Sequence, residues 1–559
     1  MAVEQITYKN IDPKVRNMIM VGLSFAMLVA CFDGTIVGTC GPVIAEDLNG
    51  TSLYSWMVTA YMLCETIMIP ISGKLSDLYG RKPLFLIGLT LFVVGSIFAG
   101  MSTSMEMLIA CRAIQGLGGG ILIPVATAAV ADLYSPKDRA RMQGILGAVF
   151  GIGSGIGPLI GGYITEYISW HWIFYINIPM ALIAYALTIK KFPTPVYDEK
   201  PIIDVKGIAF LSIMLLDILL FFEWAGSKFD WVSAESFVMI AIALAMIVLF
   251  VTVERKAAEP ILAPHLVHNK TVILACIFMF VFGLAMMGAM MYSSMFAISI
   301  LGLNTLEAGE YSLALVAGMM ITSMLSGNLV NKTGYKFWLI IGPIITALGL
   351  YMFSGMTVGT ELSYYAICLF VFGIGLGCMM SVIMVAVQNS SEPSEMGMTT
   401  SAVNVIRSIG TTVGTAIFAT LIGNRLGVEL MNHVSEFTYE HIQHGTGVLD
   451  DLANAVQNVI NGSLDPIDLS IFADMNNILL SFANSIDFAF LCGAVMMACL
   501  IIIGIFFKAQ RAPEMPREIH FDDEPVSAAT TAVSSSAQEQ SVASHGSDGT
   551  SSEEERKSD

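Results

Sequence analysis

The stretch ISGKLSDLYGRKP, residues Ile71 to Pro83, breaks a long, mostly apolar run with four charged side chains. These are Lys74, Asp77, Arg81 and Lys82. Basic residues directly after an apolar run are typical of cytoplasmic turns between membrane-spanning helices, because cytoplasmic loops carry an excess of Lys and Arg. The stretch therefore indicates a chain that crosses a membrane and turns here on the cytoplasmic side.

The composition agrees with a membrane protein and argues against several other classes. Of the 559 residues, 55% are hydrophobic and 13% charged, and the mean hydropathy of +0.72 lies far from that of soluble domains. The formal net charge of −18 says little about the membrane-spanning part, because many of the acidic residues lie after Arg425 and in the C-terminal tail.

Sequence motifs for metals, nucleotides and catalysis are missing. The nine cysteines lie in apolar runs without CxxC or Cys/His spacing, so we expect neither disulfides nor a metal site. The sequence has no GxxxxGK loop for ATP and no nucleophile and base pair beside its buried carboxylates. We therefore expect no enzyme, no cofactor and no nucleic-acid partner.

Apolar runs of about 20 residues, the length that crosses roughly 30 Å of hydrocarbon, predict fourteen helices and an all-α polytopic membrane protein. The runs lie near 17–42, 53–75, 83–102, 105–132, 139–166, 171–190, 206–226, 235–254, 271–300, 308–331, 337–357, 362–389, 400–424 and 484–508.

The distribution of basic residues predicts the orientation. Of the 27 Lys and Arg residues, this arrangement leaves only Lys228 and Arg425 in external loops, and only Arg112 and Arg407 inside spans. Because the remainder lie on one side, we expect both termini in the cytoplasm and a multi-pass protein of the plasma membrane.

A second copy of the charged turn occurs 254 residues later, in SGNLVNKTGYK. Gly327, Leu329, Gly334 and Lys336 match Gly73, Leu75, Gly80 and Lys82, whereas Asn331 and Tyr335 replace Asp77 and Arg81. Many secondary transporters are built from such repeats of helices. The offset predicts two six-helix bundles with a helix pair inserted between them.

The repeat divides the chain into regions. We expect a cytoplasmic N-terminus at 1–16, an N-terminal bundle at 17–190, an inserted helix pair at 206–254 and a C-terminal bundle at 271–508. The last bundle contains an external loop at 425–483. Residues 509–559 lack apolar periodicity and read as a disordered cytoplasmic tail.

The residues of the first turn suit a conformational latch. Gly73 and Gly80 permit close backbone approach, Asp77 can meet a helix N-terminus, and Arg81 and Lys82 can anchor at lipid headgroups. The alternative is a basic loop that only fixes the topology.

Several motifs resemble those of the major facilitator superfamily. GKLSDLYGRK resembles its signature between helices 2 and 3. Five further stretches resemble, in this order, its helix 1 drug-exporter, helix 4 and helix 5 antiporter signatures and two segments typical of its 14-helix drug:proton antiporter branch. These are FDGTIVGTCGP (32–42), CRAIQGLGGG (111–120), GSGIGPLIGG (153–162), SWHWIFYINIP (169–179) and AVQNSSEPSEMGMTTSAVNVIRSIG (386–410).

The resemblance implies a proton-coupled exporter of lipophilic, cationic drugs that works by alternating access. Its partners would be a small lipophilic substrate, protons and membrane lipids, and the chain would act as a monomer. The resemblance assigns Gly153, Gly157, Pro158, Gly161 and Gly162 to an antiporter motif. Because Gly153, Gly157 and Gly161 recur every fourth residue, they form a smooth helix face for close packing.

Charged residues inside spans are costly in lipid and mark candidate sites. At 1.5 Å per residue, Asp33, Glu65 and Arg112 lie about 15, 18 and 10 Å below the external ends of their helices, so they can share one layer. An Arg beside two carboxylates would keep one ionised and let the other respond to pH. The resemblance adds that drug exporters carry an acidic residue at the position of Asp33. We therefore expect Asp33 to serve both proton coupling and cation recognition, with Glu65 and Glu310 as secondary candidates.

Alternatives remain for each of these charges. Asp33 and Arg112 can instead form a structural ion pair. Glu310, at the start of its helix, is a further candidate for the substrate or proton, and Arg407 can snorkel back to the cytoplasm. We expect Asp217 and Glu223, on the inserted pair, to serve packing or the interface.

Two other functions remain open at the sequence level. One is an exporter of a specific anionic metabolite, siderophore or lipid, with Arg112 or Arg407 as the anchor. The other is a membrane sensor that binds through its external loop or its tail.

Overall fold

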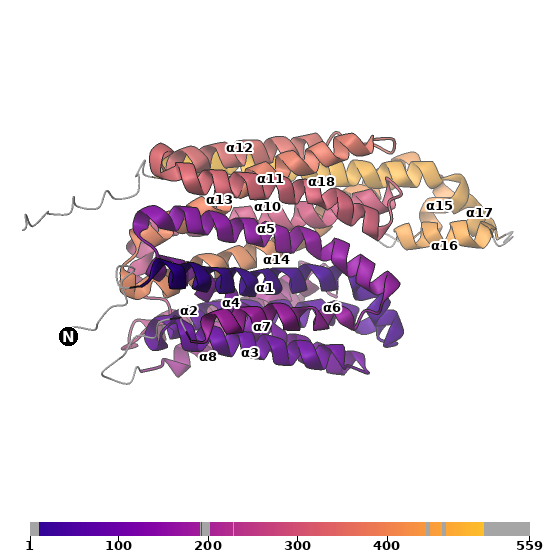
Figure 1. Cartoon of the computed structure of the whole chain (residues 1–559). Coiled ribbons are helices and arrows are strands. Elements are labelled where there is room, and N and C mark those ends of the chain that lie inside the picture. Colours follow the sequence, from indigo (N-terminus) through magenta and orange to yellow (C-terminus); the bar gives the residue numbers. More distant parts are fainter. Residues whose placement is uncertain are drawn as a thin grey trace, which may run out of the picture. The chain divides into compact units, whose positions relative to one another are not determined.

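The computed structural model describes residues 11–190, 192, 202–226, 228–442, 448–460 and 465–507, and nearly all of them are helical (Figure 1). The tail predicted at 509–559 and most of the N-terminus predicted at 1–16 lie outside the described residues.

Thirteen helices of the described chain are long and apolar enough to cross a membrane. They are α1 (Pro13–Asp47), α2 (Tyr54–Tyr79), α3 (Arg81–Gly100), α4 (Met105–Leu133), α5 (Pro136–Tyr167), α8 (Val205–Trp224), α9 (Ala234–Glu254), α10 (Lys270–Ser299), α11 (Thr305–Thr333), α12 (Tyr335–Phe353), α13 (Leu362–Ser390), α14 (Met396–His433) and α18 (Met475–Phe506). The structure confirms the predicted all-α polytopic membrane fold.

The helix predicted at 171–190 is divided in two. A short α6 (Trp172–Tyr175) is followed by α7 (Asn177–Thr188). Pro179 accounts for the break, because it has no backbone N–H and fits only the first turn of a helix. The break starts a new helix at Asn177, whose side chain belongs to the site described below.

The helices pack as two bundles. In the first, α4 contacts α2 and α3, and α1 contacts α5 and α7; in the second, α10 contacts α14, α12 contacts α13 and α18, and α11 contacts α13. The first bundle holds the indigo to purple helices of Figure 1 and the second the pink to yellow ones. The bundles meet where α5 packs against α11 and α2 against α14.

The remaining pair, α8 and α9, covers part of the seam between the bundles. Leu211 and Leu215 of α8 pack with Ile69 of α2 and Val405 of α14 in one apolar cluster. The inserted pair therefore touches both bundles through α8.

The repeated turn has the same backbone form in both bundles. Gly80 joins α2 to α3 with φ of 89°, and Gly334 joins α11 to α12 with φ of 81°. Glycine is the residue that adopts this left-handed region without strain. The turn repeated in the sequence is thus repeated in the backbone.

The segment predicted as an external loop at 425–483 is largely helical where it is described. α14 continues to His433, α18 begins at Met475, and α15 (Glu436–His441), α16 (Val448–Ile460) and α17 (Pro466–Ala473) lie between them. An ion pair between Arg425 and Glu429 at 2.5 Å, spaced i,i+4, supports the continuation of α14.

Candidate transport site

Asp33 of α1 is fully buried inside the first bundle and forms an ion pair with Arg112 of α4. Its Oδ1 also accepts hydrogen bonds from the Gln115 amide at 3.1 Å and the Asn177 amide at 2.9 Å. Arg112 donates a further hydrogen bond to the Gln115 amide oxygen at 2.9 Å. The Asp33 carboxylate is therefore held by one charged and two neutral donors.

This polar cluster connects five helices of the first bundle. Arg112 and Gln115 lie three residues apart on α4, so their side chains leave the same face. Gln115 donates to Ser96 of α3 at 2.7 Å. The guanidinium of Arg112 lies over the ring of Tyr61 of α2, 4.2 Å from the ring centroid, which is a cation–π contact.

Sequence reasoning paired Asp33 with Arg112 and missed Gln115 and Asn177. The spacing of Arg112 and Gln115 was a usable signal. Asn177 gave little signal of its own, because its approach to Asp33 depends on the break before α7.

Glu65 of α2 contrasts with Asp33. It is half-buried, and no hydrogen bond or ion pair among the described residues involves its carboxylate. The charges of Arg407, Arg112 and Asp33 act on it electrostatically. Asp33 is thus fully paired, whereas Glu65 has no such partner among the described residues.

Glu65 lies where the two bundles touch. The hydroxyl groups of Thr66, the next residue of α2, and Ser408 of α14 lie 2.6 Å apart. Ser408 follows Arg407 in the chain, so the contact brings Glu65 and Arg407 to one level of the interface.

Arg407 does not snorkel toward a helix end, and that alternative is wrong. It is only 8% exposed, and its guanidinium lies over the ring of Phe150 of α5, 5.6 Å from the ring centroid. Its Nε is buried without a hydrogen-bond partner. The position of Arg407 along α14 did not predict this, because the side chain points toward α5 in the other bundle.

The remaining carboxylates in spans lie apart from this cluster or have other contacts. Glu310 is exposed in the second turn of α11. Glu223 of α8 accepts a hydrogen bond from Thr59 of α2 at 2.8 Å. Asp217 of α8 and Asp487 of α18 each leave one buried carboxylate oxygen without a hydrogen-bond partner among the described residues. Asp487 was not among the residues predicted from the sequence.

The charged turn joins the two bundles at one end of the helices. The Asp77 carboxylate accepts hydrogen bonds from the backbone N–H groups of Gly397 at 3.0 Å and Met398 at 2.7 Å. These groups belong to the first turn of α14, where the helix dipole favours a negative charge. Asp77 therefore links the end of α2 to the start of a helix in the second bundle.

Arg81 supports Asp77 from α3. It forms ion pairs with Asp77 at 2.6 Å and with Asp132 of α4 at 2.8 Å, and it donates to the Ser76 hydroxyl at 2.5 Å. Gly73 faces α14 so closely that an added Cβ would overlap Ser401. Lys82 is half-buried.

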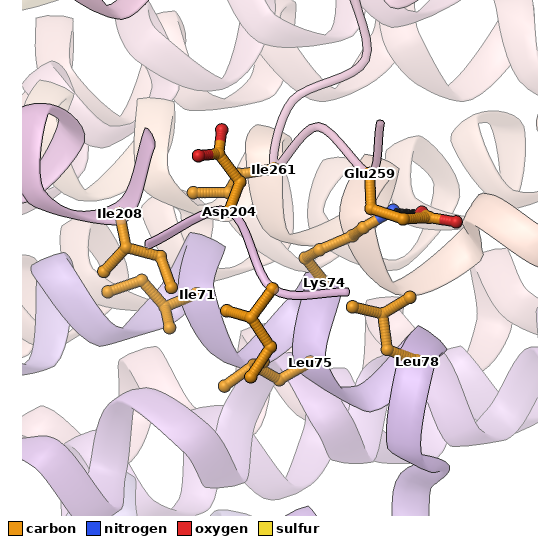
Figure 2. A pocket seen from close by; sticks show the side chains of 9 residues that line it. Ile71, Lys74, Leu75, Leu78, Asp204, Ile208, Glu259 and Ile261 are labelled. Carbon is orange, nitrogen blue, oxygen red and sulfur yellow. Dashed lines mark hydrogen bonds and ion pairs between the residues drawn. The ribbon is translucent and has the colours of Figure 1, made fainter. Parts of the chain in front are cut away.

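A small pocket lies beside this turn (Figure 2). Lys74 of α2 forms an ion pair across it with Glu259 at 2.6 Å. Glu259 lies in the segment between α9 and α10, and the rest of the lining is mostly apolar. The pair ties the segment that follows α9 to the end of α2. The residues that line the pocket are Ile71, Lys74, Leu75, Leu78, Ile203, Asp204, Ile208, Glu259 and Ile261.

The glycines of α5 form two packing faces. An added Cβ at Gly153, Gly157 or Gly161 would collide with Cys31, Thr35 or Ile36 of α1, respectively. Added Cβ atoms at Gly144, Gly147, Gly151 and Gly155 would instead meet residues of α11, a helix of the other bundle. Gly162 is looser, because its nearest contact is Leu306 at 3.9 Å, and Pro158 lies within the helix. α5 is therefore packed between α1 and α11.

Comparisons with known proteins agree with this architecture. The multidrug transporter protein MdtP of Bacillus subtilis (strain 168) is 35% identical over 412 residues, 74% of this chain and 76% of that protein. Multidrug resistance protein 3 of the same strain is 31% identical over 493 residues, 88% of this chain and 95% of that protein.

A solved structure shares the fold. The crystal structure of the human organic anion transporter MFSD10 (TETRAN) matches with a TM-score of 0.59 and 13% sequence identity, covering 88% of this chain and 100% of that chain. Residues 23–415 match the family described as the Major Facilitator Superfamily. With two helix bundles, a repeated turn and a family match over most of its length, this chain belongs to the major facilitator superfamily, whose members are membrane transporters and not enzymes.

Proposed function

We propose that this protein is an efflux antiporter that exports lipophilic, cationic drugs in exchange for protons. The names of the two Bacillus relatives support export of several drugs. The observation that carries the proton and cation part is the unpaired carboxylate of Glu65 at the bundle interface.

A carboxylate inside a span that has no partner must take up a proton or bind a cation. If a proton and a cationic substrate compete for Glu65, binding of one releases the other, which is the chemical basis of antiport. In this exchange Asp33 and Arg112 would stay ionised and paired with each other. Glu310 is a second candidate for the residue that takes up and releases the proton.

The turn at Gly73, Asp77, Gly80, Arg81 and Lys82 would act as the latch of alternating access. Its contacts with the start of α14 are hydrogen bonds and a close glycine contact, which can separate and re-form. In this proposal the turn and both termini are cytoplasmic, and the protein acts as a monomer in the plasma membrane.

Proton release by purified protein tests the exchange. Tetraphenylphosphonium, a lipophilic cation, is added to the protein in weakly buffered detergent solution, and the pH change is followed. The wild type should release protons, and Glu65→Gln should release few or none, while Arg425→Gln, which alters a charge further along α14, should behave as the wild type. Full release from Glu65→Gln would contradict the assignment of Glu65.

One observation favours a second candidate function. Arg407 offers a buried guanidinium that forms no ion pair with any described residue, which suits an exporter of an anionic metabolite, siderophore or lipid. Under that function, tetraphenylphosphonium would release no protons from the wild type, and an organic anion would bind instead.

A further inference from the structure

The proposed exchange of a proton and a cation at Glu65 does not involve Arg407. A buried guanidinium within a span is costly unless it is paired or faces a ligand. Arg407 is 8% exposed, its Nε has no hydrogen-bond partner among the described residues, and its guanidinium lies over the ring of Phe150. The Arg407 guanidinium and the Glu65 carboxylate act on each other electrostatically.

Glu65 and Arg407 approach one space from different bundles. The hydroxyl groups of Thr66 and Ser408, the residues that follow Glu65 and Arg407 in the chain, lie 2.6 Å apart. No ion pair within 4.0 Å joins Glu65 to Arg407 among the described residues. The structure thus keeps two opposite charges near each other without letting them neutralise each other.

The surface of α1 is open at two glycines that follow Cys31. Gly34 lies almost one turn after Cys31, and Gly38 lies about one turn further, so the three residues follow one face of the helix. A Cβ added at Gly34 or at Gly38 would meet nothing within 4 Å. No described atom therefore fills the space directly beside α1 at these two positions.

We propose that Glu65 and Arg407 are the two poles of a substrate site that prefers aromatic zwitterions. The cationic nitrogen of the substrate would bind Glu65, its carboxylate would bind Arg407, and its ring would pack near Phe150. The assignment of the cation to Glu65 rests on the proposed function, and the carboxylate pole is added to it.

The chemistry of each pole supports this choice of ligand. A guanidinium matches a carboxylate with two parallel hydrogen bonds, and the orphaned Nε of Arg407 is one such donor. Because the poles come from different bundles, a zwitterion would bridge the bundles. A simple cation or a simple anion would leave one pole unused.

Three dyes on one xanthene scaffold test the proposal. Rhodamine 123 is a cation, rhodamine 110 is its free acid and thus a zwitterion, and fluorescein is an anion without the cationic nitrogen. Binding to the purified protein is measured by fluorescence polarisation, without a proton gradient, for the wild type, Arg407→Gln, Glu65→Gln and Arg425→Gln.

The wild type should bind rhodamine 110 at least about tenfold more tightly than rhodamine 123, the factor expected for a charge-assisted hydrogen bond. Arg407→Gln should remove this preference and leave rhodamine 123 almost unchanged. Glu65→Gln should weaken both rhodamines, and Arg425→Gln should match the wild type. Fluorescein should bind more weakly than rhodamine 110.

The outcomes separate this proposal from the proposed function. If rhodamine 123 binds and depends on Glu65, but the wild type does not prefer rhodamine 110 or Arg407→Gln weakens both dyes equally, the carboxylate pole is wrong and the cation site stands. If rhodamine 123 does not bind the wild type, the cation site itself fails. Should Arg407→Gln not fold, the comparison of the dyes on the wild type alone still decides, because equal or tighter binding of rhodamine 123 overturns the proposal.

Discussion

Asp33 and Glu65 are carboxylates of the same bundle with opposite surroundings. Asp33 is paired with Arg112 and accepts two amide hydrogen bonds, whereas Glu65 has no such partner in the part of the chain that the structure describes. A paired buried charge is costly to disturb, and an unpaired one is available for exchange. We therefore expect substitution of Asp33 to lower the stability of the protein, and substitution of Glu65 to impair proton exchange.

Asp33→Asn should destabilise the protein. The amide keeps the shape of the side chain but leaves Arg112 buried without a counter-charge, at a cost of about 3–5 kcal/mol. Thermal melting of the purified variant measures this loss, and the double variant Asp33→Asn with Arg112→Gln should recover part of it. Unchanged melting of Asp33→Asn would mean that Asp33 is already neutral in the folded protein, and Asp33 would then replace Glu65 as the candidate proton carrier.

The sequence predicted the charged residues of the site better than its neutral ones. Asp33 and Arg112 were paired from their depth, because charges in spans are rare and stand out. Gln115 and Asn177 are neutral, so their contribution depends on packing that a single sequence does not show. The position of Arg407 was misjudged because depth along a helix says nothing about the direction in which a side chain points.

At the scale of elements, the end of α2 is joined to the start of α14 through one aspartate. Asp77→Asn should weaken this junction by about 1 kcal/mol, which changes the ratio of closed to open forms about fivefold. We expect slower export of tetraphenylphosphonium from cells with little loss of folded protein, measured by size-exclusion chromatography.

Asp138→Asn is a matched control for the latch. Asp138 also lies in the first turn of a helix, where it contacts Ser135 of its own segment, so it does not join the bundles. Export should be near normal in this variant. If both Asp77→Asn and Arg81→Ala export at the wild-type rate, the turn serves topology alone.

The segment before α18 carries a pH-dependent contact. Asp474 accepts hydrogen bonds from the Ser435 hydroxyl and the Thr438 hydroxyl, each at 2.7 Å. Burial by itself would raise the pKa of Asp474, but the hydrogen bonds from Thr438 and Ser435 outweigh it and hold this pKa below its usual value. The contribution to stability is therefore present above the unfolded pKa of about 3.9 and is lost as the pH falls through the folded pKa.

Hydrogen exchange at the Ser435 and Thr438 amides, corrected for intrinsic rates, measures this contact. Protection should hold from neutral pH to about pH 4 and decline below it, and Asp474→Asn should reduce protection at neutral pH. Loss of protection well above pH 4, or no effect of Asp474→Asn, would contradict the role of this carboxylate.

The positions of the spans could be predicted from the sequence better than their exact ends. Apolar length located the spans because the hydrocarbon thickness fixes it. It predicted that α14 ends at 424 and that α18 begins at 484, but α14 continues through Arg425 and Glu429 to His433, and α18 begins at Met475. It also missed the break before Asn177, which Pro179 causes.

At the scale of the whole molecule, the repeated turn predicted two bundles, and the structure has them. The contacts between the two bundles could not be predicted from the sequence. α2 and α14 touch from Asp77 and Gly397 to Thr66 and Ser408, and α8 covers part of this seam. These pairings join residues that are hundreds of positions apart, and no local pattern indicates them.

The central claim is that a cation and a proton exchange at Glu65. Purified protein is placed in liposomes that carry a proton gradient, with the membrane potential clamped by valinomycin and potassium, and a pH-sensitive dye reports the gradient when tetraphenylphosphonium is added. We predict that wild-type vesicles lose the gradient and that Glu65→Gln vesicles and empty vesicles keep it. A gradient that persists with the wild type, or that collapses equally with Glu65→Gln, would contradict this claim.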